Sequence, residues 1–158
     1  MTEKNTKYMQ MAIDASRENV KNCGGPFGAV IVNDKDEVLS VGVNRVTANN
    51  DPTAHAEVSA IRAACQKKGD FSLKDCVIYS SCEPCPMCLS AIYWSGIRKI
   101  YYGNTARDAE RIGFSDRFIY KEISKPRSER AVPCECMMRD EAQSAFNDWE
   151  NKTDKTPY

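Results

Sequence analysis

Three of the eight cysteines in this chain lie within seven residues, in the sequence CEPCPMC at 82–88. The chain has a single histidine, His55, in the segment HAE at 55–57. Clustered cysteines in a chain without a secretion signal point to a metal or to catalysis before disulfides. The scattered cysteines fit the interpretation of small buried hydrophobic residues. They are Cys23, Cys65, Cys76, Cys134 and Cys136.

Length and composition indicate one ordinary globular domain over residues 1–158. Hydrophobic residues make up 42% and charged residues 28%, and 22 basic residues balance 22 acidic ones. This balance argues against a protein that mainly binds nucleic-acid phosphates. No stretch approaches the ~18 apolar residues of a membrane helix. The first residues, MTEKNTKY, contain no apolar signal core, so we expect a cytoplasmic protein.

Hydrophobic spacing predicts an alternation of helices and strands. Helices are expected over about 7–21, from 51–53 to the residue before Gly69, over 85–95, over 105–112, and over 140–151 with Asp140 as its cap. Strands are expected over 28–33, around 38–43, over 76–80, over 98–103 and over 130–138, with 114–128 as a loop.

This order predicts an α/β fold, a three-layer α/β/α sandwich with a five-stranded mixed sheet. Residues 33–36 (NDKD) form a turn, so the first two strands make an antiparallel hairpin. Strands that are separated by helices should run parallel. Pro133 confines the fifth strand to an edge or a bulge.

The two cysteines of PCxxC, Cys85 and Cys88, lie one helical turn apart and share a face. Zinc in catalytic sites takes three protein ligands in a tetrahedral arrangement and leaves the fourth position to water. His55 completes a set of three. Glu57 lies two residues beyond His55, which suits contact with the water better than contact with the metal, so it is the expected general acid and base.

Two other interpretations remain open for these residues. A CxxC pair is often a redox pair. If Cys82 were also a ligand, the site would be closed and structural, with no position for water. Cys82 ends a predicted strand, and Glu83-Pro84 would have to fold back for it to join the site. Glu57 separates a catalytic zinc site from a structural one, because a structural zinc module needs no general acid and base.

The pattern H-x-E…P-C-x-x-C is the signature of zinc deaminases that act on nucleobases. The chain resembles the cytidine deaminase superfamily, and more narrowly the bacterial guanine deaminases. The resemblance covers most of residues 24–123. It is carried by GGPFGAVIV (24–32), NDPTAHAEVSAIRAAC (50–65), SSCEPCPMCLSAIYW (80–94), GFSDRFIYKEI (113–123) and the final Tyr158.

The resemblance implies hydrolytic deamination of guanine to xanthine and ammonia, with Zn²⁺ as the cofactor and no organic cofactor. Zinc would lower the pKa of its bound water, and the resulting hydroxide would attack C2 of guanine. Glu57 would carry a proton to a ring nitrogen and then to the leaving amine. The backbone N–H of Ala56, near a helix start, would help to bind the developing oxyanion.

The resemblance also implies residues that contact the purine base. Asn44 would hydrogen-bond the base, although a turn asparagine is the alternative. Phe27 and Trp94 would stack on the purine, with core packing as the alternative. Asp116 would pair with base N–H groups, unless it is an ordinary loop aspartate. Tyr158 and the tail at about 139–158 would close over the site by exchange between the subunits of a homodimer.

Related substrates remain as alternatives. Guanosine deaminases share DPTAHAEV and a terminal tyrosine, so the free base is not separated from the nucleoside. A tRNA adenosine deaminase would need a basic surface, whereas residues 98–130 have nine Lys/Arg against five Asp/Glu, only a mild excess. Cytosine and cytidine deaminases are further alternatives, although small tetrameric cytidine deaminases carry Cys where His55 stands.

Overall fold

The computed structural model describes residues 3–158 of the chain. The chain divides into two compact units, unit 1 over Met1–Arg117 and unit 2 over Phe118–Tyr158. No helix in the described part of the chain is long and apolar enough to span a membrane.

A mixed sheet of four strands forms the centre of unit 1, in the order β2-β1-β3-β4. The strands are β1 (Gly28–Asn33), β2 (Val38–Val43), β3 (Cys76–Cys82) and β4 (Lys99–Asn104). β1 pairs antiparallel with both β2 and β3, and β3 pairs parallel with β4. The α/β class, the mixed sheet and the opening hairpin are therefore confirmed.

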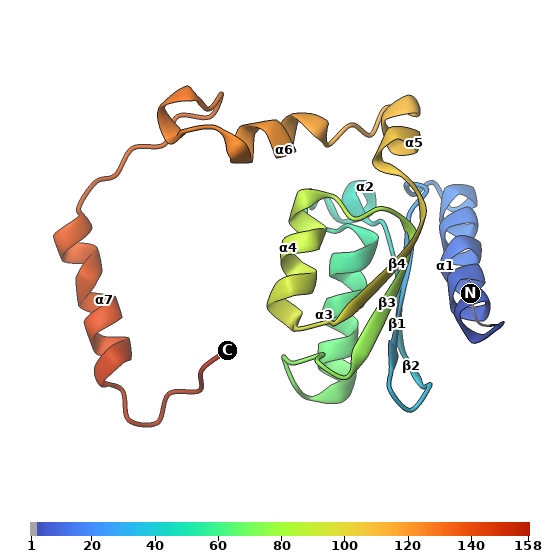
Figure 1. Ribbon diagram of the computed structural model, residues 1–158, viewed down its shortest axis with the longest axis horizontal. Helices are drawn as coiled ribbons and strands as arrows, with labels where there is room; N and C mark the ends of the chain where they lie inside the picture. The colour runs from blue at the N-terminus through green and yellow to red at the C-terminus, as the bar shows by residue number, and fades with distance from the viewer. Residues whose placement is uncertain (1–2) are drawn as a thin grey trace. The chain divides into compact units, whose positions relative to one another are not determined.

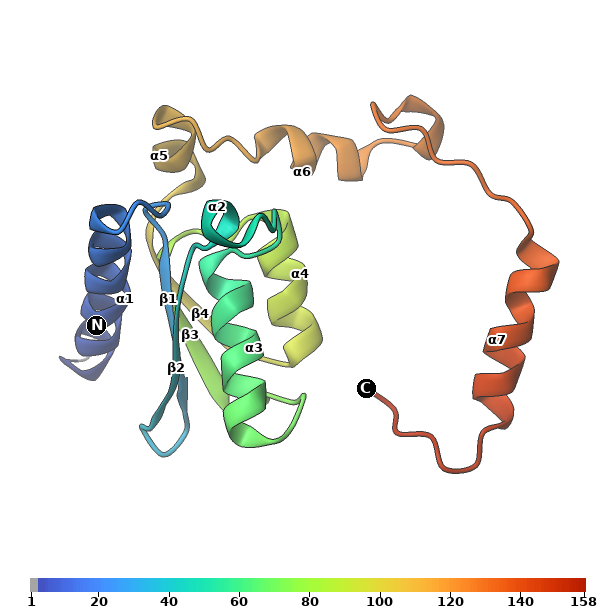
Figure 2. The same ribbon diagram turned by 180° about the vertical axis from the view of Figure 1, so that it is seen from behind.

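Helices cover both faces of this sheet (Figures 1 and 2). Helix α1 (Glu3–Lys21) lies on one face, and α3 (Ala56–Lys68) and α4 (Pro86–Ser95) lie on the other. The side-chain alternation of β3 divides the core accordingly, because successive residues of a strand point to opposite faces. Tyr79 packs in the cluster with Tyr8 of α1, whereas Ile78 packs in the cluster with Ile92 of α4.

Turn chemistry sets the start of α3 later than expected. Asp51 accepts hydrogen bonds from the backbone N–H and the hydroxyl of Thr53, at 2.8 and 2.7 Å. This bonding keeps both residues in a turn, so neither caps the helix, and His55 stands at the N-cap position instead. A short helix that was not expected, α2 (Val46–Asn49), lies just before this turn.

The remaining boundaries in unit 1 follow the predictions closely. Gly69 and Gly96 end α3 and α4 in the left-handed conformation expected of a C-terminal glycine. Helix α5 (Ala106–Arg111) begins with a capping box, in which Thr105 and Asp108 each bond the backbone N–H of the other.

Unit 2 departs from the predictions in two places. Residues 114–128, expected as a loop, contain helix α6 (Arg117–Ser124) and part of the 3₁₀ helix η1 (Arg127–Glu129). Residues 130–138, expected as the fifth strand, form no strand, so the five-stranded sheet is wrong. Pro133 has no N–H to donate, and no described strand pairs with this segment, so its backbone gains no ladder.

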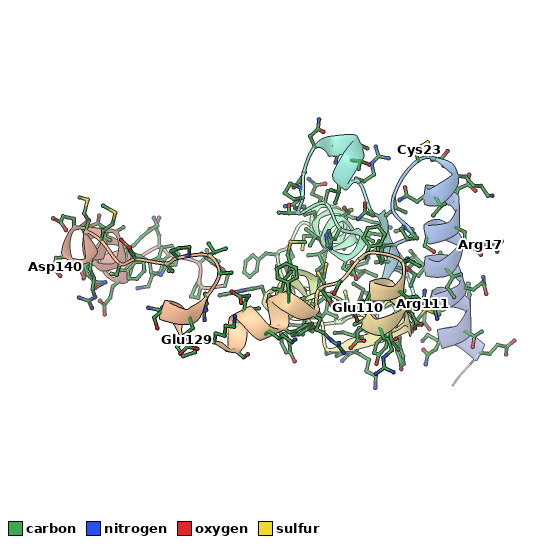
Figure 3. The ribbon with its side chains drawn as sticks, turned by 90° about the horizontal axis from the view of Figure 1, so that it is seen from above. Arg17, Cys23, Glu110, Arg111, Glu129 and Asp140 are labelled. Atoms are coloured by element: carbon green, nitrogen blue, oxygen red, sulfur yellow. The ribbon has the colours of Figure 1, made fainter. Side chains whose placement is uncertain are left out.

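The last helix, α7 (Arg139–Asn151), confirms the predicted one, but Asp140 lies in its first turn and is not its cap. No residue of α6, η1 or α7 is buried in the structure as described. The acidic side chains of Glu129 and Asp140 are exposed, and so are large apolar ones (Figure 3). The exposed apolar residues of unit 2 are Phe118, Tyr120, Ile123, Val132, Met137, Met138, Phe146, Trp149 and Tyr158.

Candidate metal centre and its surroundings

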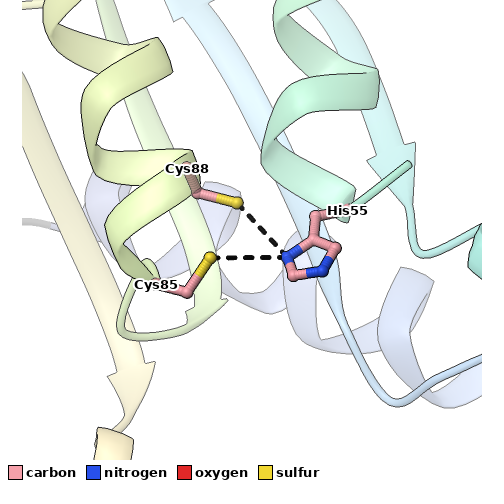
Figure 4. A group of neighbouring side chains, drawn as sticks. All are labelled: His55, Cys85 and Cys88. Atoms are coloured by element: carbon pink, nitrogen blue, oxygen red, sulfur yellow. Dashed lines mark hydrogen bonds between the residues drawn. The ribbon is translucent and has the colours of Figure 1, made fainter. Parts of the chain in front are cut away.

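Two helix starts bring the predicted ligands together (Figure 4). His55 is the N-cap residue of α3 and Cys85 is the N-cap residue of α4, while Cys88 lies in the first turn of α4. Pro86 occupies the first helical position of α4, where its missing N–H costs nothing. Helix N-termini carry partial positive charge, which favours thiolates at this point.

The three side chains have the spacing of a zinc site. The Nδ1 atom of His55 lies 3.5 Å from the Sγ atoms of both Cys85 and Cys88, and the three ligand atoms lie within 4.8 Å of one another. Tetrahedral zinc with Zn–S and Zn–N bonds of ordinary length requires an N···S separation of about 3.6 Å. The donor set therefore fits zinc with three protein ligands.

Of the three ligands, Cys85 loses its proton most readily. A hydrogen bond from Cys88 and another with His55 lower the pKa of Cys85 to about 4, despite burial. The pKa of Cys88 is raised, first by its interaction with Cys85 and then by burial. The hydrogen bond with Cys85 raises the pKa of His55. The thiol pair thus shares one proton, which a metal ion would displace.

Cys82 is not part of this group. It is buried at the end of β3, where its Sγ lies 3.8 Å from the backbone oxygen of Thr105. Burial, followed by the nearby charge of Glu57, raises its pKa to about 11. Cys82 is therefore a protonated thiol that donates to a carbonyl, which leaves three ligands in the group rather than four.

Glu57 lies beside the three ligands and is only 5% exposed. Its Oε2 atom accepts from the Sγ of Cys88 at 3.3 Å, and its Oε1 atom accepts from the hydroxyl of Ser80 at 3.0 Å. Burial raises the pKa of Glu57, and its own backbone N–H, Cys88 and Ser80 oppose that shift. A buried carboxyl group of raised pKa next to a metal site is suited to proton transfer.

Asn44 and Phe27 lie together at the ends of neighbouring strands. Asn44 follows β2 and is buried, and its backbone N–H donates to the carbonyl oxygen of Phe27 at 3.2 Å. Its side-chain oxygen accepts from the backbone N–H of Val46 at 3.3 Å. Phe27 precedes β1, and its ring meets that of Phe114 edge to face at 5.0 Å.

Asp116 is half-buried, and burial raises its pKa, followed by the negative charge of Cys85. It is thus within electrostatic reach of the ligand group. Ala56 is fully buried as the first residue of α3. Trp94 is 75% exposed on α4, and Tyr158 is 83% exposed in unit 2, so neither is in a core.

Sequence reasoning missed three residues around this site. Ser80 holds Glu57, as described above. Asn19 of α1 is buried and donates to the carbonyl oxygens of Gly25 and Asn44, at 2.8 and 2.9 Å, which supports the loop before β1. Glu83 accepts from the backbone N–H of Ala106 at 2.9 Å and so ties α5 to the end of β3. No local pattern marks Ser80 or the contact of Asn19 with Asn44, because each of these pairs is separated by more than 20 residues of sequence.

Comparisons with known proteins agree with this geometry. The family model described as the cytidine and deoxycytidylate deaminase zinc-binding region matches residues 2–104. The guanine deaminase of Bacillus subtilis is 48% identical over 152 residues, which cover 96% of this chain and 97% of that protein.

A crystal structure of guanine deaminase from Bacillus subtilis has a TM-score of 0.94 at 46% identity, covering 100% of this chain and 99% of that chain. The tRNA-specific adenosine deaminase of Buchnera aphidicola is 29% identical over 153 residues, which cover 96% of this chain and 97% of that protein. At equal coverage of this chain, its sequence identity to the guanine deaminase of Bacillus subtilis is thus higher than to the tRNA-specific adenosine deaminase of Buchnera aphidicola.

Proposed function

Because the chain belongs to the cytidine and deoxycytidylate deaminase family of zinc-binding enzymes, we propose that it hydrolyses guanine to xanthine and ammonia. The observation that carries the proposal is the group of His55, Cys85 and Cys88 beside the buried carboxyl group of Glu57. The similarity to a guanine deaminase over nearly the whole chain supports guanine as the substrate. The proposal includes the three-layer arrangement, which the helices on both faces of the sheet support.

In this proposal His55, Cys85 and Cys88 hold the zinc ion. A bound zinc ion would supply a water molecule of lowered pKa as the nucleophile for C2 of guanine. Glu57 accepts a proton from that water at Oε2 and passes it to a ring nitrogen. It then takes the remaining proton of the added hydroxyl group and delivers it to the departing amino group, so that guanine and water give xanthine and ammonia. The burial of Glu57 supports this role, because it raises the pKa of the carboxyl group and so makes it a better proton acceptor.

The same proposal assigns the base contacts. Asn44 hydrogen-bonds the purine and Phe27 packs against its ring, which is supported by their joint position at the strand ends. Asp116 pairs with base N–H groups, which is supported by its electrostatic reach to Cys85. The backbone N–H of Ala56, at the start of α3, donates to the developing oxyanion. Polar pairs of this kind reject a base that leaves them unsatisfied.

We further propose that the functional form is a homodimer in which a second copy covers unit 2. The large apolar side chains exposed in α6, α7 and the tail support this, because no residue of these two helices is buried within the chain and a second copy would cover them. In that dimer, Trp94 and Tyr158 complete the purine site, and the tail over 139–158 acts as its lid and is exchanged between subunits. A chain truncated after residue 138 that keeps full guanine turnover would contradict the lid.

Guanosine is the second substrate to consider, because the segment DPTAHAEV does not separate the free base from the nucleoside. We do not favour a tRNA substrate, since the 22 basic and 22 acidic residues provide no net charge for binding phosphates. We expect the enzyme to act in the cytoplasm.

The first test measures ammonia release by zinc-loaded protein with guanine, guanosine, cytosine, cytidine and adenine, with Glu57→Gln as the blank. Turnover of guanine alone supports the proposal. Turnover of guanosine with guanine inert moves the substrate to the nucleoside. If all five are inert, the proposed reaction is wrong, and a zinc assay then asks whether the site is structural.

A further inference from the structure

The two oxygen atoms of Glu57 have different neighbours in this structure. Oε1 accepts from the hydroxyl of Ser80 at 3.0 Å, while Oε2 lies 3.3 Å from the Sγ of Cys88, one of the three ligands. Ser80 is 2% exposed and Glu57 is 5% exposed, so both contacts are shielded from bulk solvent. The carboxyl group therefore has an anchored oxygen and an oxygen on the ligand side.

The register of the sheet explains how Ser80 reaches Glu57. Ser80 is in β3, where it pairs with Ala29 of β1 on one side and Tyr102 of β4 on the other. Side chains alternate between the faces of a strand, so Ser80 points to the same face as Ile78. That face carries α3, and Glu57 lies in the first turn of this helix. A strand bonded on both sides is a rigid base for this hydroxyl.

A hydroxyl at this position needs a partner. A buried hydroxyl without a hydrogen bond is costly, and so is a buried carboxylate without donors. Ser80 and Glu57 satisfy each other across 23 residues of sequence. The two contacts of Glu57 also respond differently to zinc binding. A cysteine that binds zinc is a thiolate and has no proton to donate. The contact of Cys88 with Oε2 then ends, while the bond from Ser80 to Oε1 remains.

We propose that Ser80 is a positioning residue of the reaction: its hydroxyl holds Oε1 of Glu57 and so keeps Oε2 directed to the water and the substrate amine. This inference rests on the proposed function, because it assigns Glu57 the proton transfer. Ser80 acts through Glu57 and does not touch the substrate.

The test compares Ser80→Ala with Ser80→Thr, which keeps a hydroxyl. Ser40→Ala is the matched control, because Ser40 is also buried and donates to a carbonyl of the same helix α3, that of Ala60, at 2.8 Å. For each variant, kcat, KM, zinc per chain and the unfolding midpoint are measured on the panel substrate that the wild type turns over best.

We expect Ser80→Ala to lower kcat by about 10- to 100-fold, the range for losing a hydrogen bond to a charged group. KM and zinc content should stay within about threefold, because the ligands and base contacts are untouched. Ser80→Thr should keep kcat within about tenfold of the wild type, allowing for the strain of an added methyl group. Ser40→Ala should lose stability and keep kcat.

Three outcomes would overturn the inference: an unchanged kcat in Ser80→Ala, a parallel loss of zinc, or an equal loss of kcat in Ser40→Ala. A crystal structure of zinc-loaded Ser80→Ala tests it without turnover. We expect more than one orientation of the Glu57 carboxylate there, and a single unchanged orientation would overturn the inference. If the wild type releases no ammonia from guanine, the proposed function fails, and the crystal structure still decides the role of Ser80.

Discussion

Units 1 and 2 of this chain use apolar residues in opposite ways. Unit 1 buries them in two clusters on the two faces of its sheet, and the proposed metal ligands and Glu57 lie at the end of one of these layers. Unit 2 has helices with apolar side chains and, over residues 118–158, no buried residue in any helix. Unit 1 therefore carries the stability that positions the chemistry, whereas the contribution of unit 2 depends on what covers it.

The largest effect expected from this comparison is on turnover, with Glu57→Gln in unit 1. Glutamine keeps the shape of the side chain but cannot transfer the proton, so turnover should fall by about 10²- to 10⁴-fold. Zinc content should not change, because Glu57 is not among the three ligands. The measurement is ammonia release together with zinc per chain.

The exposed Glu37 in the turn between β1 and β2 provides a control, and Glu37→Gln should have wild-type turnover. Turnover of Glu57→Gln near the wild-type rate would refute the assigned proton transfer. A loss of zinc in this variant would instead make Glu57 part of the metal site.

The second effect is on stability, and it compares a buried side chain of unit 1 with an exposed one of unit 2. Ile78 is fully buried, so Ile78→Ala should lower the free energy of unfolding by about 2–5 kcal/mol. Phe146 is 71% exposed on α7, so Phe146→Ala should change it by less than about 0.5 kcal/mol in dilute protein.

Urea unfolding at fixed zinc and at two protein concentrations measures both variants. If Phe146→Ala destabilises the protein only at the higher concentration, Phe146 lies in a contact between copies, as the proposed dimer requires. A cost for Phe146→Ala as large as that for Ile78→Ala at every concentration would break the contrast between the units.

The same division explains how far the fold was predictable from the sequence. In unit 1 the apolar periodicity and the glycines predicted all four strands and the helices of both layers, because local patterns and burial agree there. In unit 2 the run at 130–138 has apolar residues in a strand-like pattern but no neighbouring strand. Periodicity reports which residues are apolar, and it cannot report whether a neighbouring strand is available to pair with them.

The candidate site was predictable to a similar degree. The pattern of His55, Glu57 and the two cysteines of PCxxC predicted the ligand group, because helix starts and ligand spacing are local properties. The start of α3 was misplaced, since the turn bonding of Asp51 and Thr53 resembles a cap in sequence. Ser80 was missed because its role depends on strand register, which the sequence does not state.

A third prediction uses the cysteines. Burial, followed by the charge of Asp75, raises the pKa of Cys76 to about 11, and Cys82 is buried with a pKa of about 11. Cys134 and Cys136 of unit 2 are exposed. Because the thiolate is the reactive form, iodoacetamide at neutral pH should modify Cys134 and Cys136 at least about 100-fold faster than Cys76 or Cys82 in zinc-loaded protein.

Peptide mass spectrometry over a time course measures these rates. Cys23 is the control within unit 1, because it is exposed just after α1 and should react early (Figure 3). Slow modification of Cys134 and Cys136 that becomes faster on dilution would show that a second copy covers unit 2. Fast modification of Cys76 would mean that unit 1 opens more readily than its core indicates.

The smallest effect concerns an ion pair of each unit. In unit 1, the Nζ atom of Lys68 lies 2.5 Å from the Oδ1 atom of Asp75. This hydrogen bond is the main reason that the pKa of Asp75 is lowered. The folded state thus holds this proton less tightly than the unfolded state. The stabilisation is present above about pH 4, the ordinary pKa of an aspartate, and is lost as the pH falls through the lowered value. Because both side chains are partly exposed, we expect about 0.5 kcal/mol.

The Lys152–Asp154 pair of unit 2 is similar in length, at 2.6 Å, but more exposed and without a surrounding core. Asp75→Asn should therefore reduce the loss of stability between pH 5 and about pH 3. Asp154→Asn should change the free energy of unfolding by less than about 0.5 kcal/mol, because its ion pair is largely exposed. Unfolding free energies of both variants across this range measure the difference. If the free energy of unfolding depends on pH in the same way in both variants, the core of unit 1 does not strengthen its surface ion pair. The contrast between the units would then be confined to apolar burial.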